Sequence, residues 1–311
     1  MLEQVSPATM GGTGASADGA LRDRASEAWY TSWLIIFRRN RMALTGLLLV
    51  LLFLVLALFA PWIAPYDFQA QDLANNVHPP SLAHPFGTDD VGRDILSRIM
   101  LGARTSFLIA LVAVGIGLFA GVTIGLVSGY YGSTSDLLIM RTVEVLQTIP
   151  TIVLAVAIVS VLQTGILSVM IAVGVTGIPV YARLARGTVL SLKEMEYVSA
   201  ARCLGAGACC ILWRHLLPNA LAPIIVQTSL GAGQAILVAA ALSFLGLGVQ
   251  PPTPEWGAML SRGRTYVTFA PHLVAFPGMA IAALVLGFNL LGDGLRDTID
   301  PRMRRLAEKG A

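Results

Sequence analysis

The sequence predicts an all-α membrane protein with six transmembrane helices. Hydrophobic residues make up 55% of its 311 residues and charged residues only 13%, whereas soluble domains are about a quarter charged. Six apolar segments are each long enough to cross a bilayer core of about 30 Å. Most basic residues lie on one side of these segments, as membrane topology requires. The small net charge of +3 gives no indication of nucleic-acid binding.

The two ends of the chain are expected to lie outside the membrane. Residues 1–30 are rich in Gly, Ala and Ser without an apolar period, so we predict a flexible cytosolic tail. We divide the rest into three parts: the first transmembrane helix with an external loop (31–104), a core domain of five transmembrane helices (105–300) and a cytosolic C-terminal tail (301–311).

The predicted spans follow from apolar length and from turn residues. No charged residue occurs between Glu144 and Arg183, a stretch too long for one helix, so we place a turn at 163–165, which reads Gln-Thr-Gly. Glu144 itself is expected to pair with Arg141, one turn earlier, rather than to carry protons. The six spans are 42–64, 106–128, 142–162, 165–181, 219–245 and 272–291.

The basic residues set the orientation of these spans. If the N-terminus is cytosolic, the outside loops hold only five of them, Arg93, Arg98, Arg104, Arg262 and Arg264. The other basic residues then face the cytosol, in agreement with the positive-inside rule. This orientation places both termini in the cytosol, together with the stretch between the fourth and fifth spans.

That stretch, residues 196–223, is the longest one in which polar and apolar residues alternate with each other instead of forming an apolar run. The chain is organised around it. A stripe with a spacing of three predicts a short amphipathic helix; its members are Leu192, Met195, Val198 and Ala201. Gly205 and Gly207 end this helix, because glycine destabilises helices and permits a sharp reversal. A second short helix is predicted over 208–217, closed by Pro218, where the next span begins.

The same stretch resembles the EAA loop of ABC-importer permeases. Ala200 and Ala201, the glycine at 205 and the Leu-Pro pair at 217–218 keep the spacing of that loop, whereas Ser199 replaces its glutamate and His215 its isoleucine. The resemblance implies a cytosolic coupling helix that docks on a separate ATPase, although the lost glutamate removes one charge from that contact. The implied ATPase-coupling residues are Glu196, Ser199, Ala200, Ala201, Arg202, Gly205, Leu217 and Pro218.

Two further motifs narrow the resemblance. Residues 87–98 read GTDxxGRDxxSR and residues 292–301 read GDxLRDxxDP, and both are similar to the C-type subunit of the dipeptide/oligopeptide/nickel permease family. By chemistry alone the first motif has a competing interpretation as a calcium loop, formed by Asp89, Asp90 and Asp94, but its spacing does not fit an EF-hand. The resemblance covers about residues 33–302, nearly the whole chain.

The family implies a fold, a location and partners. The fold is that of a type I ABC-importer permease in the bacterial cytoplasmic (inner) membrane, with both termini cytosolic. The implied partners are a homologous second permease subunit, two cytosolic ABC ATPase subunits, an external substrate-binding protein and the lipid bilayer, with no nucleic acid. ATP and Mg²⁺ would belong to the ATPase subunits, and no cofactor is expected on this chain.

The sequence also argues against catalysis by the chain itself. A Walker A loop needs a glycine before its lysine. The only lysines are Lys193, after Leu192, and Lys309, after Glu308, so neither belongs to such a loop. The three cysteines lie near His215 without a Cys-x-x-Cys spacing, which argues against a zinc site; they are Cys203, Cys209 and Cys210.

Two patterns inside the spans suggest packing or transport roles. A glycine recurs at every fourth residue of the second span, at Gly117, Gly121, Gly125 and Gly129, which favours tight helix packing over a flexible gate. Gln227 and Gln234 lie seven residues apart on one face of the fifth span. Buried amides need partners, so they either bond a neighbouring helix, which we slightly favour, or face a wet channel as pathway residues.

Three alternatives to a peptide importer stay open. A same-family importer for glutathione, nickel or another small solute has the same sequence features, although none of the four His residues lies deep in a span to bind nickel. An ion-coupled secondary transporter would need inverted repeats and buried ionisable residues. A membrane scaffold without transport activity is the third.

Overall fold

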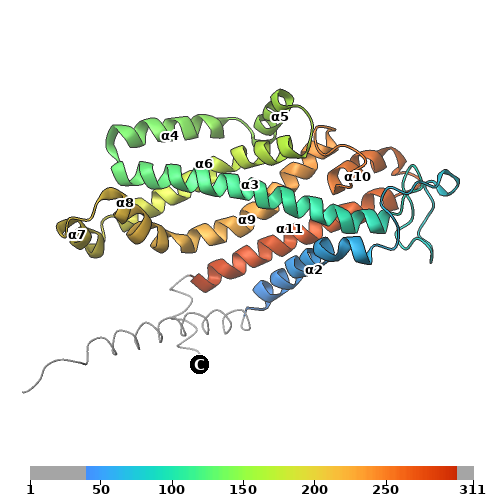
Figure 1. Cartoon of the computed structure of the whole chain (residues 1–311), viewed down its shortest axis with the longest axis horizontal. Coiled ribbons are helices and arrows are strands. Elements are labelled where there is room, and N and C mark those ends of the chain that lie inside the picture. The colour runs from blue at the N-terminus through green and yellow to red at the C-terminus, as the bar shows by residue number, and fades with distance from the viewer. Residues whose placement is uncertain (1–39, 300–311) are drawn as a thin grey trace, which may run out of the picture.

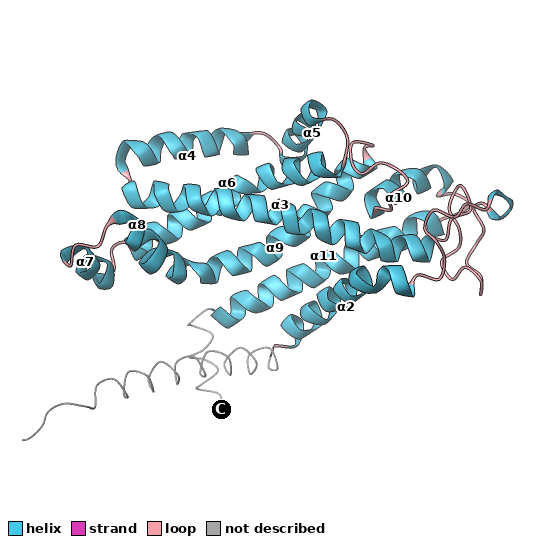
Figure 2. Cartoon of the chain, viewed as in Figure 1, coloured by secondary structure: helices cyan, strands magenta, loops and turns pink. Residues whose placement is uncertain are grey.

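The computed structural model describes residues 40–299, and all regular elements in that range are helices (Figures 1 and 2). The predicted tails at 1–30 and 301–311 lie outside the described residues. The main helices are α2 (Arg41–Ile63), α3 (Ile95–Tyr131), α4 (Ser133–Thr148), α5 (Thr151–Leu162), α6 (Ile166–Leu192), α7 (Glu196–Cys203), α8 (Ala208–Cys210), α9 (Leu217–Phe244), α10 (Trp256–Gly263) and α11 (His272–Ile299). Shorter turns of helix are η1 (Leu73–Asn75), η2 (Ile211–Leu216) and η3 (Arg264–Tyr266).

The helices form an elongated bundle with loops at both ends. Among the described residues, five helical segments are long and apolar enough to cross a membrane, and the bent pair α4–α5 makes a sixth when it is counted as one span. The segments α3 and α6 lie side by side, α11 packs on both α2 and α9, and α10 lies between α9 and α11 at one end (Figure 1). This arrangement confirms the predicted all-α membrane fold.

The third span is broken, so the prediction of one straight helix over 142–162 is wrong. Helix α4 ends at Thr148, α5 begins at Thr151, and the two are bent by 93°. Pro150 has no N–H to donate, and it forces Ile149 out of the helical region to φ −84° and ψ 126°. The proline was visible in the sequence, but the uninterrupted hydropathy concealed its effect.

The predicted stop at Pro218 is also wrong. Helix α8 continues through the π-helical segment η2 into α9, and Pro218 lies in the first turn of α9. The Leu217 N–H donates to the Leu212 carbonyl, a π-type spacing, and Asn219 Nδ2 donates to the His215 carbonyl over 2.7 Å. Pro218 has no N–H to donate to the preceding turn, and these two bonds satisfy neighbouring carbonyls instead. The helix therefore continues through Pro218.

The predicted turn at 163–165 is confirmed. Gln163 has φ +69° and Gly165 has φ +156°, and α6 begins at the next residue, Ile166. Helix α6 then runs to Leu192, eleven residues beyond the predicted end of the fourth span at 181. Helices α3 and α11 likewise extend beyond their apolar parts, so the bundle is longer than the hydrophobic segments alone indicate.

Candidate functional site

Helix α7 lies at the end of the bundle opposite α10 and the loop between α2 and α3 (Figure 1). Val198 is fully buried in a core cluster with Ile211 and Leu216 of the following segment. Glu196 and Ala200 remain exposed. The short helix is therefore held by one apolar side and presents small and polar residues outward.

The stripe predicted for this helix is only partly correct. Met195 is the residue before the helix and is exposed, because α6 ends at Leu192 and the chain turns between the two helices. Ala201 is buried, one turn after Val198, and so packs against this chain rather than outward. Ala201, which the resemblance places among the ATPase-coupling residues, is therefore not on the exposed surface, whereas Ser199, Ala200 and Arg202 are exposed.

Gly205 makes the elbow after α7. Its φ is +82°, its N–H donates to the Arg202 carbonyl over 2.9 Å, and the Ala206 N–H donates to the Ala201 carbonyl over 3.0 Å. This pair of bonds is a Schellman motif, in which the left-handed residue is usually glycine. The backbone therefore requires glycine at 205, and Gly207, with φ −71°, has no such requirement.

The remaining residues of the expected coupling set lie around this elbow. The Arg202 guanidinium lies over the Tyr130 ring at 5.6 Å from its centroid, which links α7 to the end of α3. Leu217 is half-buried and Pro218 exposed, both in the first turn of α9. All eight residues thus belong to the same end of the molecule, but the last two are part of a long helix rather than of the loop.

An ion pair that sequence reasoning missed lies at the same end. Arg186 of α6 donates from Nε and Nη2 to the two carboxylate oxygens of Asp136 on α4, each over 2.6 Å. The Ser128 hydroxyl of α3 donates to the same carboxylate. The three residues join α3, α4 and α6. No local spacing signals this contact, because Asp136 and Arg186 are fifty residues apart.

Replacing Asp136 by asparagine is expected to lower the stability of the protein by roughly 1–3 kcal/mol, because two charge-assisted hydrogen bonds are lost. The measurement is thermal unfolding of the purified protein. Glu144→Gln is the matched control: the Arg141–Glu144 pair, found at 3.2 Å as the spacing predicts, has 74% and 52% exposed side chains, so its loss costs about 0–1 kcal/mol. Equal melting temperatures for the two variants would contradict this ranking.

The glycines of α3 face α6. A Cβ at Gly121 would lie 2.6 Å from the Ile178 carbonyl oxygen, and one at Gly129 would lie 3.1 Å from the Arg186 carbonyl oxygen. Gly117 and Gly125 point at the same neighbouring helix. The stripe therefore lets two helix backbones approach each other closely, which is the packing arrangement favoured from the sequence.

A cavity of about 330 Å³ lies between α3, α5, α6, α9 and α11. Its polar lining residues are all uncharged: Thr151, Thr176, Tyr181, Gln227, Gln234 and Asn289. The Tyr181 side chain is 3% exposed, and within residues 40–299 its hydroxyl has no hydrogen-bond partner. The cavity thus offers amide and hydroxyl groups without a full charge.

Both glutamines lie at the wall of this cavity. In the described part of the chain neither side-chain amide is hydrogen-bonded to another helix, so the helix-contact interpretation that we slightly favoured is wrong. The seven-residue spacing was the correct signal for a shared face. It could not tell which neighbour that face meets, because this depends on how α6 and α11 pack.

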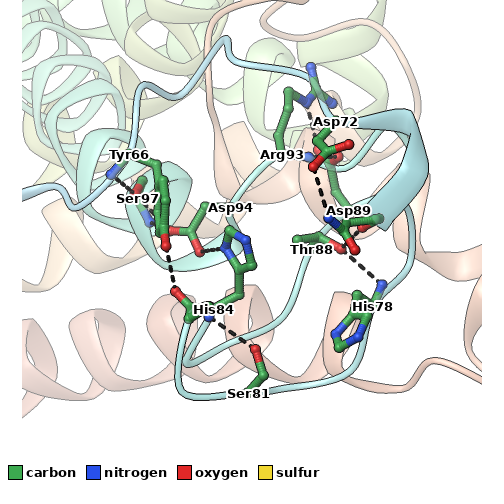
Figure 3. A network of polar contacts seen from close by, with 12 residues as sticks. Tyr66, Asp72, His78, Ser81, His84, Thr88, Asp89, Arg93, Asp94 and Ser97 are labelled. Carbon is green, nitrogen blue, oxygen red and sulfur yellow. Dashed lines mark hydrogen bonds and ion pairs between the residues drawn. The ribbon is translucent and has the colours of Figure 1, made fainter.

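At the α10 end, the motif 87–98 folds into a polar network (Figure 3). Arg93 Nε donates to Asp89 over 2.7 Å, and the Asp94 carboxylate contacts His84 Nδ1 at 3.0 Å and accepts from the Ser97 N–H and hydroxyl. These carboxylates face protein partners instead of converging on a common point, which argues against the calcium-loop interpretation. The described residues contain no cluster of three or more potential metal ligands.

A bundle of membrane-spanning helices that encloses a polar cavity and projects a short helix at one end defines the chain as a membrane permease subunit. Residues 121–305 match the family described as the inner membrane component of binding-protein-dependent transport systems, and residues 28–83 match the N-terminal transmembrane domain of oligopeptide transport permease C. The chain belongs to the family of inner membrane components of binding-protein-dependent transport systems. It is an ABC-importer permease of the dipeptide/oligopeptide group, located in the inner membrane.

Two relatives cover most of the chain. The dipeptide transport system permease protein DppC of Alkalihalophilus pseudofirmus is 46% identical over 86% of this chain and 88% of its own length. The glutathione transport system permease protein GsiD of Escherichia coli O6:K15:H31 is 48% identical over 91% and 93%. Among solved structures, the inward-facing MetNI methionine ABC transporter has a similar fold, with a TM-score of 0.54 and 18% identity over 65% of this chain and 96% of that chain.

Proposed function

We propose that the chain forms half of the translocation pathway of an ATP-driven importer for dipeptides or oligopeptides. The observation that carries this proposal is the uncharged, amide-lined cavity between the spans. Peptides differ in side-chain charge but share backbone amides, which glutamine, asparagine and hydroxyl groups match as donors and acceptors. A lining without fixed charge accepts cationic, neutral and anionic peptides alike.

The same lining separates some of the alternative solutes from peptides but not all of them. Glutathione is itself an anionic tripeptide, so the uncharged lining does not distinguish it from other peptides. Nickel would need imidazole or carboxylate ligands, and none lines the cavity in that part of the chain. Glutathione remains the second candidate, because a relative named for its transport is 48% identical to this chain.

We propose that α7 is the coupling helix and that its exposed face, Glu196, Ser199, Ala200 and Arg202, docks in a groove of an ATPase subunit. Both termini and α7 then lie in the cytosol, and ATP and Mg²⁺ stay on two ATPase subunits. A homologous permease supplies the other half of the pathway, and an external binding protein delivers the substrate. Buried Val198 and the Arg202–Tyr130 contact would transmit movement of α7 to the spans.

Uptake by the reconstituted complex tests the function. Proteoliposomes that contain the permease pair and its ATPases are supplied with a labelled dipeptide, glutathione or Ni²⁺, with and without ATP and binding protein. We expect dipeptide uptake that requires both ATP and binding protein. Uptake of glutathione or Ni²⁺ alone would identify another substrate, and uptake driven by an ion gradient without ATP would refute the importer.

The double variant Gln227→Leu/Gln234→Leu is expected to lower the kcat/KM of peptide uptake about 5- to 150-fold, because each lost hydrogen bond contributes about 0.5–1.5 kcal/mol. Its melting temperature should stay that of the wild type, since neither amide bonds another helix. The control is Gln147→Leu on α4, outside the cavity lining, which should leave uptake unchanged. Lower stability with normal uptake per folded complex would assign the glutamines to packing.

A further inference from the structure

Three arginines and two aspartates meet around a small hollow at the α10 end of the bundle. Arg93 comes from the loop before α3, Arg98 from the first turn of α3 and Arg262 from α10, while Asp89 and Asp90 belong to the loop. All five line a hollow of about 20 Å³. The cluster lies far from the cavity between the spans and takes no part in the proposed pathway.

The five side chains are poorly matched to one another. Arg93 Nε lies 2.7 Å from Asp89, but the other ion-pair distances are longer: 3.6 Å from Arg98 to Asp89, 3.7 Å from Arg93 to Asp90 and 3.8 Å from Arg262 to Asp90. Only the first is a hydrogen bond. The other Asp89 oxygen is occupied by the backbone N–H groups of Val91 and Arg93.

Two guanidinium donors are left over. Arg93 Nη2 and Arg98 Nε are buried and have no hydrogen-bond partner within residues 40–299; each lies only at ion-pair distance from a carboxylate, 3.7 Å from Asp90 and 3.6 Å from Asp89. Three positive charges against two negative ones leave the cluster with one excess positive charge. A buried charged donor without an acceptor is costly, so a native structure needs a group there to accept from it.

The two other carboxylates of this loop region, Asp94 and Asp72, are engaged elsewhere. Asp94 points to the other side of the loop, where His84 and Ser97 hold it (Figure 3). Asp72, drawn beside Arg93 in Figure 3, is exposed, and its oxygens accept from the Ala74 N–H and from Asn75 Nδ2. In the described part of the chain no carboxylate comes within hydrogen-bond distance of these two donors, so an acceptor from outside these residues would complete the site.

The size and walls of the hollow define the acceptor. Space of about 20 Å³ holds one particle about the size of a water molecule, and it is too small for a peptide carboxylate with its attached chain. Ile95, Met259 and Leu273 supply apolar walls, which a weakly hydrated monatomic anion tolerates. Arg262 also lines the hollow, and its side chain is 39% exposed, so this part of the wall is in contact with solvent.

We propose that this hollow binds one monatomic anion of the chloride class, held by Arg93 Nη2 and Arg98 Nε with Arg262 in the part of the wall that contacts solvent. The anion balances the excess charge and connects the loop 87–94 to α3 and α10. Binding stabilises the folded protein, because an anion that binds only the folded state shifts the unfolding equilibrium by mass action.

Equilibrium binding of ³⁶Cl⁻ to the purified full chain in nanodiscs tests the site directly. We expect about one ion per chain, displaced by bromide. In parallel, the melting temperature is measured in chloride and in gluconate at equal ionic strength, and it should rise by about 3–5 °C for each tenfold increase of chloride above its Kd. Anomalous diffraction from bromide-soaked crystals should place a peak between Arg93 and Arg98.

Arg262→Gln should weaken chloride binding at least about tenfold while the protein still folds, because this side chain is partly exposed; Arg98→Gln should abolish binding. Arg264→Gln is the control, since the exposed Arg264 lies over Phe244 outside the cluster and should bind chloride normally. If Arg98→Gln does not fold, the proposal is tested by chloride binding to Arg262→Gln and by the bromide peak in the wild-type protein. Absent ³⁶Cl⁻ binding, or binding unchanged in Arg262→Gln, would mean that the hollow holds only water and overturn the proposal.

Discussion

Replacing Gly205 by valine is expected to abolish ATP-driven peptide uptake while the protein still inserts into the membrane. A β-branched residue at φ +82° is strongly disfavoured, and such a strained backbone position costs of order 1–3 kcal/mol. The Schellman bonds to Arg202 and Ala201 would be lost, and α7 would leave its orientation towards the ATPase. The measurement is the ATPase rate in nanodiscs with and without loaded binding protein: basal hydrolysis should persist and its stimulation should disappear.

Gly207→Val is the matched control for that experiment. Gly207 has φ −71° and open space around it, so a side chain is tolerated and stimulation should stay normal. A second variant, Ala200→Asp, tests the docking surface itself, because Ala200 is exposed and the change leaves the core intact. The neighbouring change Ala201→Asp is unsuitable, because Ala201 is buried and the aspartate charge would be buried with it. Full stimulation and full uptake in both Gly205→Val and Ala200→Asp would show that this loop is not the coupling element.

Sequence reasoning predicted the features that depend on neighbours along the chain. The turn at 163–165, the short helix within 196–223 and its end before Gly205 follow from local turn chemistry and apolar spacing, and the structure contains all three. The packing role of the glycine stripe of α3 could also be predicted, because glycines repeated at every fourth residue of a helix favour close packing against a neighbouring helix.

The features that the sequence concealed depend on contacts between distant segments or on competing local rules. The Asp136–Arg186 pair joins residues fifty positions apart, and the anion-binding hollow needs a loop, α3 and α10 together. Pro150 breaks its span and Pro218 does not. Ile149, directly before Pro150, has an extended backbone, so the helix stops there. Pro218 follows a π-helical turn that accommodates it, and a hydropathy pattern cannot reveal such a turn.

Gly125→Leu is expected to prevent stable assembly of the spans. A Cβ at Gly125 would lie 2.8 Å from the Ala185 Cβ and 2.9 Å from the Arg186 backbone nitrogen, and it would also collide with the Ala182 carbonyl. Backbone atoms cannot rotate away, so α3 and α6 must separate. Overpacking of a tight site typically costs about 1–3 kcal/mol, and the displaced Arg186 would also weaken its pair with Asp136. We expect a large loss of monodisperse protein on size exclusion and a lower melting temperature.

Gly115→Leu provides the comparison on the same helix. Nothing among the described residues lies within 4 Å of a Cβ built at Gly115, so leucine fits there and should, if anything, stabilise the helix. The two substitutions change helix propensity and hydrophobicity equally, and they differ in the presence of α6 opposite the new side chain. A normal yield and melting temperature for Gly125→Leu would contradict the close approach of α3 and α6, while equal losses in both variants would point to insertion rather than packing as the cause.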